Sequence, residues 1–204
     1  MYDESITTET YGDYKIEILP DDAPCHPRKD YDNLGHMVYG HGRYTVGDED
    51  VDDNDDPDFD PTSWDDWAAY VKEHRGAKVV LPVYMYEHSG ITISTSPFSC
   101  SWDSGQVGII YDDREARLNN EKYMNEPFTV EHLTEILQGE IKTYDTYLRG
   151  EVVGFRVTGP HGYQESCWGF YDEDDALSEA RAELWCAVTL HLKQDAKINR
   201  MMAL

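Results

Sequence analysis

The sequence predicts an α+β protein in which a single, largely antiparallel sheet of five or six strands packs against about three helices, mainly on one face. Two hairpin patterns, at 78–96 and 151–171, predict neighbouring antiparallel strands. Three segments carry apolar residues at helical spacing, and few connections require a crossover between strands. We therefore expect one domain over residues 1–204, with 20–61 forming an irregular acidic loop region after the first strand.

The first strand is predicted from alternation. Apolar and polar side chains alternate over 14–19, and Pro20, Asp21 and Asp22 follow as a turn signal. The residues up to 47 are rich in Pro, Gly, Asp and His, with one short candidate strand at 37–39. Large apolar and aromatic side chains are interspersed among them, so we expect an ordered loop region.

A helix is predicted after the most acidic part of the chain. Thr62 and Ser63 are suitable N-caps, and Asp66 has the spacing of a capping box. Gly76 is a natural C-terminal stop. Positions i, i+3, i+4 and i+7 of this segment form one apolar stripe: Trp64, Trp67, Ala68 and Val71.

The middle of the chain is predicted to form strands. The near-continuous apolar run of 78–87 predicts a central strand, which the turn at 88–90 joins to an alternating strand at 91–96. Residues 106–111 predict another strand. The polar stretch 112–127 is expected to be a connection with a helical turn around Glu115–Leu118.

The last third of the chain predicts two helices around a hairpin. Thr129 caps the first helix, which ends at Gly150, and the hairpin occupies 151–171. Asp174 or Asp175 opens the final helix. Its apolar face is predicted to contain Leu177, Ala180, Leu184, Ala187, Val188 and His191.

Charge is the most unusual property of this chain. There are 41 Asp and Glu against 17 Lys and Arg, a formal net charge of −24, and residues 1–60 alone hold 18 acids and 4 bases. Such a surface repels nucleic acid and anionic membranes and attracts basic proteins. We therefore expect a basic protein partner, with no direct binding of nucleic acid and no membrane association.

The cysteines and the apolar runs bear on location. No signal-peptide pattern and no run near 18 apolar residues occurs in the sequence, which favours the cytoplasm. The four scattered cysteines, Cys25, Cys100, Cys167 and Cys186, match no zinc spacing. Free, mostly buried thiols in a reducing cytosol are the expectation, although an even count leaves disulfides open.

The acidic run 48–60 has nine acids in 13 positions. As a calcium loop it lacks the glycine at position 6, where Asp55 stands, and the glutamate at position 12, where Pro61 stands. We expect no metal and no cofactor. A solvated loop and a contact surface for a basic groove are the remaining interpretations. The candidate contact residues, including the extension onto the following helix, are Asp48, Glu49, Asp50, Asp52, Asp53, Asp55, Asp56, Asp58, Asp60, Asp65 and Asp66.

A small hydrolase or ligand-binding enzyme is the alternative hypothesis. His88, Asp103 and Ser104 lie at predicted strand ends and are the residue types of a base, an orienting carboxylate and a nucleophile. No G-x-S-x-G motif accompanies them, and small polar residues also simply make turns.

Six segments resemble an uncharacterised family of small acidic proteins of phages, plasmids and other mobile elements. They are Pro27-Arg28 through Tyr31-Asp32-Asn33-Leu34-Gly35, Arg43-Tyr44-Thr45-Val46-Gly47-Asp48, Leu81-Pro82-Val83-Tyr84 with His88-Ser89-Gly90, Trp102-Asp103-Ser104-Gly105-Gln106-Val107-Gly108, Tyr144-Asp145 with Tyr147-Leu148, and Ser166-Cys167-Trp168-Gly169-Phe170. The resemblance spans about residues 14–171. The chain departs from the family pattern at Gly40-His41-Gly42 and in its extended acidic loop. The resemblance implies an accessory gene of a mobile element and transfers no catalytic residue.

Together these observations favour a non-enzymatic phage or mobile-element protein acting in the host cytosol. It is expected to inhibit a host defence or DNA-binding protein through a carboxylate-rich surface that resembles DNA in charge density. A competing explanation is that the acidity reflects the proteome of the host, in which case the chain is a soluble binding module of another kind.

Overall fold

The computed structural model describes residues 5–54, 56 and 59–202, with only the backbone described for 194–202. Its class is α+β, as predicted, but this part of the chain forms two sheets and four α-helices rather than one sheet and three helices. The chain divides into two compact units. We call residues 1–25 with 150–204 the terminal unit and residues 26–149 the central unit. The single domain stays a prediction, and each unit is described by itself.

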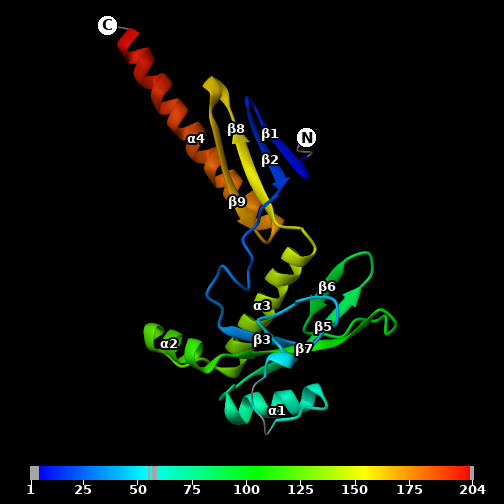
Figure 1. The fold of residues 1–204 in the computed structure, drawn as a ribbon. Helices are drawn as coiled ribbons and strands as arrows, with labels where there is room; N and C mark the ends of the chain where they lie inside the picture. The colour runs from blue at the N-terminus through cyan, green and yellow to red at the C-terminus, as the bar shows by residue number, and fades with distance from the viewer. Residues whose placement is uncertain (1–4, 55, 57–58, 203–204) are drawn as a thin grey trace. The chain divides into compact units, whose positions relative to one another are not determined.

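The terminal unit is a four-stranded antiparallel sheet covered by one long helix (Figure 1). Its strands lie in the order β1 (Thr7–Tyr11), β2 (Tyr14–Pro20), β8 (Val153–Thr158) and β9 (Gln164–Phe170). The helix is α4 (Glu173–Met202). The hairpin predicted at 151–171 is confirmed as β8 and β9.

Pairing between the two ends of the chain builds this unit. Ile18 of β2 lies opposite Phe155 of β8, so a strand near the N-terminus becomes the neighbour of one 137 residues later in the chain. Alternate residues of both strands face α4, and its predicted apolar face is confirmed at Ala180, Leu184 and Ala187. The core contains Ile16, Ile18, Val153, Phe155, Val157, Ala176, Ala180 and Leu184.

The central unit contains a five-stranded sheet. Its strands lie in the order β4 (Glu49–Asp50), β3 (Gly35–Tyr39), β7 (Ser104–Asp112), β5 (Val80–Glu87) and β6 (Ile91–Ser94). Only the β3–β4 pair is parallel among these strands. The hairpin predicted at 78–96 is confirmed as β5 and β6.

Helices cover both faces of this sheet, so the prediction of helices mainly on one face is wrong for the central unit. α3 (Val130–Leu148) packs on one face and α1 (Trp64–His74) on the other (Figure 1). Ile110 of β7 joins the core under α3, whereas its neighbour Ile109 joins the core under α1. A strand buried on both faces carries apolar residues at successive positions, which explains the run Ile109-Ile110-Tyr111 in β7.

Two expectations for connecting segments also need correction. Residues 20–61 contain β3, β4 and the 3₁₀ helix η1 (Val51–Asp53), so this region is not irregular throughout. The polar stretch after β7 forms a full helix, α2 (Arg114–Met124), which Asp113 caps. Apolar periodicity does not predict α2, because this helix buries no apolar stripe. Its buried residue is Arg117, whose guanidinium pairs with Asp112.

The thiols are free, but the prediction that they are mostly buried is wrong. Cys25, Cys167 and Cys186 are exposed, and Cys100 is half-buried. Cys167 lies on β9, an edge strand of the terminal sheet whose first five residues are all exposed. A residue type that is usually buried is therefore left at the surface by its place in the sheet.

Candidate functional site

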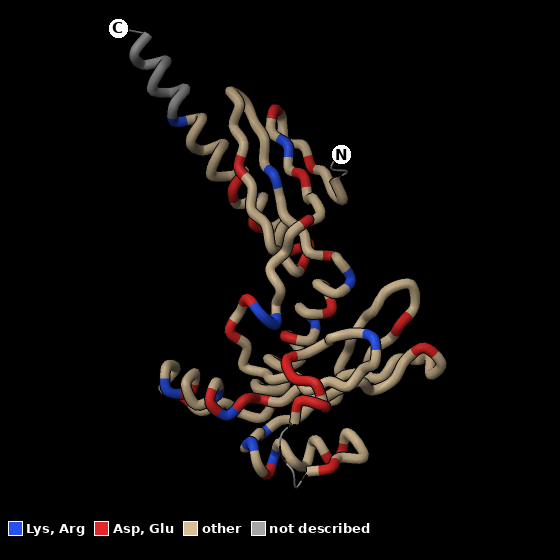
Figure 2. Tube along the Cα trace, viewed as in Figure 1, with Lys and Arg blue, Asp and Glu red and all other residues tan. Residues whose placement is uncertain are grey.

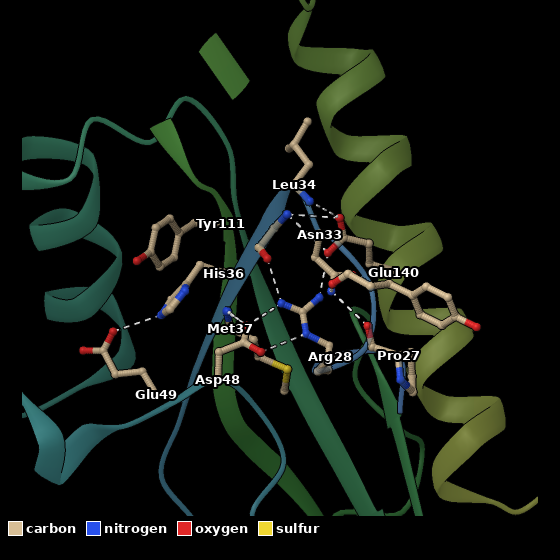
Figure 3. Close-up of polar contacts among 12 residues, drawn as sticks. Pro27, Arg28, Asn33, Leu34, His36, Met37, Asp48, Glu49, Tyr111 and Glu140 are labelled. Atoms are coloured by element: carbon tan, nitrogen blue, oxygen red, sulfur yellow. Dashed lines mark hydrogen bonds and ion pairs between the residues drawn. The ribbon is translucent and has the colours of Figure 1, made fainter. Parts of the chain in front are cut away.

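The acidic run begins with a carboxylate that holds the central unit together. Asp48 accepts hydrogen bonds from Arg28 Nε at 3.1 Å and from the Met37 amide at 2.8 Å (Figure 3). Arg28, whose side chain is only 2% exposed, also donates to Glu140 at 2.7 Å and to the Gly35 carbonyl at 2.7 Å. Asp48 is therefore engaged inside the molecule.

The second carboxylate of the run is also internal. Arg75 donates to Glu49 through both terminal nitrogens, at 2.6 and 2.8 Å, and His36 Nε2 lies 3.0 Å from the same carboxylate. Burial alone would raise the pKa of Glu49, but the hydrogen bonds from Arg75 and His36 outweigh burial and lower the pKa to about 2. Glu49 stays ionised and fixes β4 beside β3.

Three further carboxylates of the candidate set stabilise local structure. Asp50 caps η1 by accepting from the Asp52 amide at 3.1 Å, and Asp56 accepts from the Tyr70 hydroxyl at 3.0 Å. Asp66 accepts from the Thr62 amide at 2.9 Å, which lowers the pKa of its carboxyl and completes the predicted capping box of α1.

Four candidate carboxylates are exposed and have no partner among the described residues. Asp52, Asp53, Asp60 and Asp65 are exposed, and no other described residue pairs with their side chains. Asp55 and Asp58 lie outside the described residues. Figure 2 marks acidic positions in both units, with a run of them where β4 and η1 precede α1. We call Asp52, Asp53, Asp60, Asp65 and the pocket beside them the acidic face.

The pocket of the acidic face has an aromatic floor. It is open, has a volume of about 470 Å³, and is lined by Val51, Asp52, Asn54, Phe59, Asp60, Pro61, Thr62, Ser63, Trp64 and Trp67. Phe59 stacks on Tyr70 with ring centroids 4.0 Å apart and meets Trp67 edge to face at 4.9 Å. The Trp64 indole donates to the Gln106 carbonyl at 3.2 Å, which fixes its ring in the pocket wall.

The helical spacing predicts Trp64 and Trp67 only as members of one apolar stripe. Trp67 is buried, but Trp64 is half-buried and lines the pocket. The N-cap could have indicated the position of Trp64. Because Ser63 caps α1, Trp64 is the first residue of the helix and directly follows the acidic run.

Among the described residues, no hydrogen bond or ion pair joins the side chains of the enzyme hypothesis, His88, Asp103 and Ser104, to one another. Ser104 donates to the Cys100 carbonyl, and the Asp103 carboxylate accepts from the Cys100 thiol at 3.8 Å. His88 stacks near Tyr86 with ring centroids 6.0 Å apart. An open pocket of about 490 Å³ includes His88, but neither Asp103 nor Ser104 is among the residues that line it. The arrangement offers no aligned nucleophile, base and carboxylate among these three residues.

Comparisons with protein-family models, curated proteins and solved structures found no match. In the described part of the chain, no three His, Cys, Asp or Glu side chains gather in a way that could hold a metal ion. No helix in the same residues is both long enough and apolar enough to cross a bilayer.

Proposed function

We propose that this chain is a non-enzymatic binding protein that engages a basic partner protein through the acidic face. The observation that carries this proposal is an aromatic-lined pocket that includes the exposed Asp52 and Asp60, with the exposed Asp53 and Asp65 next to lining residues in the sequence. Charge alone does not select the surface, because the central unit holds 25 acids and 11 bases and the terminal unit 16 acids and 6 bases. What distinguishes the acidic face is that its exposed carboxylates adjoin a pocket lined by the aromatic rings of Phe59 and Trp64.

The pocket suits a cationic side chain better than an apolar one. Asp52 and Asp60 supply negative charge at its rim, and Phe59 and Trp64 supply ring surface for an aliphatic stem or a guanidinium plane. Arginine fits both features because its planar cation stacks on aromatic rings and pairs with carboxylates. The same aromatic cluster already holds one such group, since Arg75 lies 5.9 Å from the Trp67 centroid and 5.6 Å from the Tyr70 centroid.

The partner class follows from this chemistry. Proteins that bind DNA present lysine and arginine along a groove, and a compact acidic surface competes with DNA for it. The resemblance to mobile-element proteins favours a host defence or DNA-binding protein as that partner. Binding is expected to be fast and to weaken steeply with salt, because exposed charges are screened.

A direct test uses a fluorescein-labelled nona-arginine peptide and fluorescence anisotropy at low salt. The test variant replaces Asp52, Asp53, Asp60 and Asp65 by Asn. The matched control replaces four other exposed acids of the same unit, Glu115, Glu126, Glu131 and Glu135, by Gln. Both variants lose four negative charges, so total charge cannot explain a difference between them. We expect the test variant to bind about tenfold or more weakly than the control.

Equal losses of affinity in the two variants would mean that peptide binding depends only on net charge, and the acidic face would be ruled out.

A second experiment seeks the natural partner by affinity capture from a lysate of the native host at low salt. Capture of a DNA-binding or defence protein by the wild type and by the control, but not by the test variant, supports the proposal. Equal capture by all three proteins contradicts it.

A further inference from the structure

The terminal unit carries an apolar stripe on α4 that the other described residues cover only in part. Trp185 is 74% exposed and Leu192 is 64% exposed. They are seven residues apart, with the half-buried Val188 between them, so all three lie along one flank of the helix. This flank adjoins the face on which Leu184 packs against the sheet. Isolated exposed hydrophobics are ordinary, but three in helical register form a continuous surface.

An apolar groove lies beside this stripe. It has a volume of about 610 Å³ and is lined by Tyr11, Gly12, Asp13, Tyr14, Arg181, Leu184, Trp185 and Val188. The charge of Arg181 is matched within the unit, because its guanidinium forms an ion pair with Glu9. In a chain of net charge −24, a groove lined mainly by ring and aliphatic carbon suits a bulky apolar side chain.

The distribution of charged residues along α4 indicates which partner covers the stripe. Its first half, 173–187, has five acids and one base, whereas its second half, 188–202, has three bases and one acid. Two copies of α4 in antiparallel orientation bring the acidic half of each copy beside the basic half of the other. A parallel arrangement would place like charges together.

The position of the tryptophan agrees with this symmetry. The midpoint of α4 falls between Ala187 and Val188, close to Trp185. A two-fold axis at that point places both copies of Trp185 at the centre of the contact, where a large aromatic side chain contributes most to affinity. In a two-fold contact each copy supplies both a projecting Trp185 and an apolar groove, so the same interaction forms twice.

We propose that a second copy of this chain docks on α4 in antiparallel orientation, with each Trp185 inserted into the apolar groove of the other copy. The proposal concerns the terminal unit alone and is independent of the acidic face. It assigns a role to an exposed indole that the fold of one copy does not use.

Sedimentation equilibrium of the full chain, from about 1 to 200 µM, tests the proposal. The wild type is expected to rise with concentration from 23.5 kDa to twice that mass. In Trp185→Ser the dimer dissociation constant is expected to increase about 100-fold or more, because a central side chain is lost from both copies. Trp102→Ser is the matched control: it removes an indole that is 94% exposed in the central unit, and should leave the dissociation constant unchanged.

A charge reversal provides the second test. Lys197→Glu with Arg200→Glu is expected to weaken the dimer, and adding Asp175→Lys with Glu179→Lys is expected to restore it, with circular dichroism confirming that α4 stays helical. A wild type that is monomeric over the whole range, a Trp185→Ser dimer as strong as the Trp102→Ser dimer, or a failed restoration with α4 intact would each overturn the proposal. A monomeric wild type would leave the groove to a different apolar ligand.

Discussion

Arg28 and Glu140, 112 positions apart in the chain, form a buried ion pair in which Nη1 lies 2.7 Å from Oε2. The same glutamate accepts from the Leu34 amide at 2.8 Å and from the Gly35 amide at 3.0 Å. Through these contacts α3 fixes the start of β3, and Asp48 joins the same guanidinium from the other side. The pair therefore joins the acidic run to the framework of the central unit.

Removing the guanidinium should destabilise the central unit severely. Arg28→Met leaves the largely buried carboxylates of Asp48 and Glu140 without their cation, and breaking a buried pair in this way costs about 3–5 kcal/mol. Urea denaturation followed by tryptophan fluorescence measures the loss. Arg43→Met is the control, because Arg43 pairs with Glu87 at the surface with 69% of its side chain exposed, and should have a much smaller effect. Equal losses for the two variants would contradict the structural role of Arg28.

The Glu49 carboxylate predicts an acid-dependent loss of stability. Its pKa is about 2 in the folded chain against 4.5 as the ordinary value, so the folded state favours the ionised form. This contribution, on the order of 3 kcal/mol, is complete above about pH 5 and disappears as the pH falls towards 2. Glu49→Gln should therefore be less stable than the wild type at pH 7, with the gap closing at low pH.

Urea denaturation of both proteins at several pH values between 7 and 2.5 measures that gap. A difference in unfolding free energy that stays constant over this range would show that the ionisation of Glu49 does not contribute. Asp65→Asn is a suitable control, because Asp65 is exposed and no described residue pairs with its side chain. Its gap from the wild type should stay small at every pH.

Gly154 of β8 is required by the tryptophan that lies across it. A Cβ at Gly154 would overlap the indole of Trp168 and come within 2.7 Å of the Cys167 carbonyl oxygen. Gly154→Ala should therefore displace Trp168 and destabilise the terminal unit by about 1–3 kcal/mol. Hydrogen exchange of the β8 and β9 amides measures the effect. Gly105→Ala in β7 is the control and should not change stability, because its Cβ would meet nothing within 4 Å. Unchanged hydrogen exchange in Gly154→Ala would refute the expected clash.

Trp64 predicts a preference among basic peptides. If its ring supports a bound guanidinium, Trp64→Leu should weaken nona-arginine binding several-fold more than nona-lysine binding, because arginine gains more from stacking. Anisotropy with the two labelled peptides measures the ratio. An equal loss for both peptides would restrict the acidic face to charge attraction, without a role for the aromatic floor.

Local signals predicted much of the secondary structure. Ser63 and Asp66 marked the start of α1, Thr129 marked that of α3, and the turn at 88–90 joined β5 to β6, as expected. These features depend on contacts within a few residues. α2 escaped prediction because Arg117 is its buried residue, and the burial of an arginine depends on a partner outside the helix.

The candidate site was predictable as a segment but not as a surface. Nine acids in 48–60 predicted an acidic loop, yet Asp48 and Glu49 are neutralised within the central unit by Arg28 and Arg75. The sequence shows how many charged residues the chain has, but not which of them form ion pairs. The outward carboxylates, and the pocket that Trp64 lines, follow from the way α1 packs beside the loop.

By itself, the sequence determined the α+β class, the starts of α1 and α3, both hairpins and the strong negative charge, because periodicity, capping and composition are local or additive properties. It placed the start of α4 at Asp174 or Asp175, whereas the helix begins at Glu173. Only the tertiary structure decided that the strands form two sheets, that β2 joins β8, and that α1 and α3 cover opposite faces of one sheet. It also decided which carboxylates of the acidic run pair with other described residues and which stay exposed. The physical reason is that strand pairing and burial join residues more than 100 positions apart, and the energy of each contact depends on what surrounds it in space.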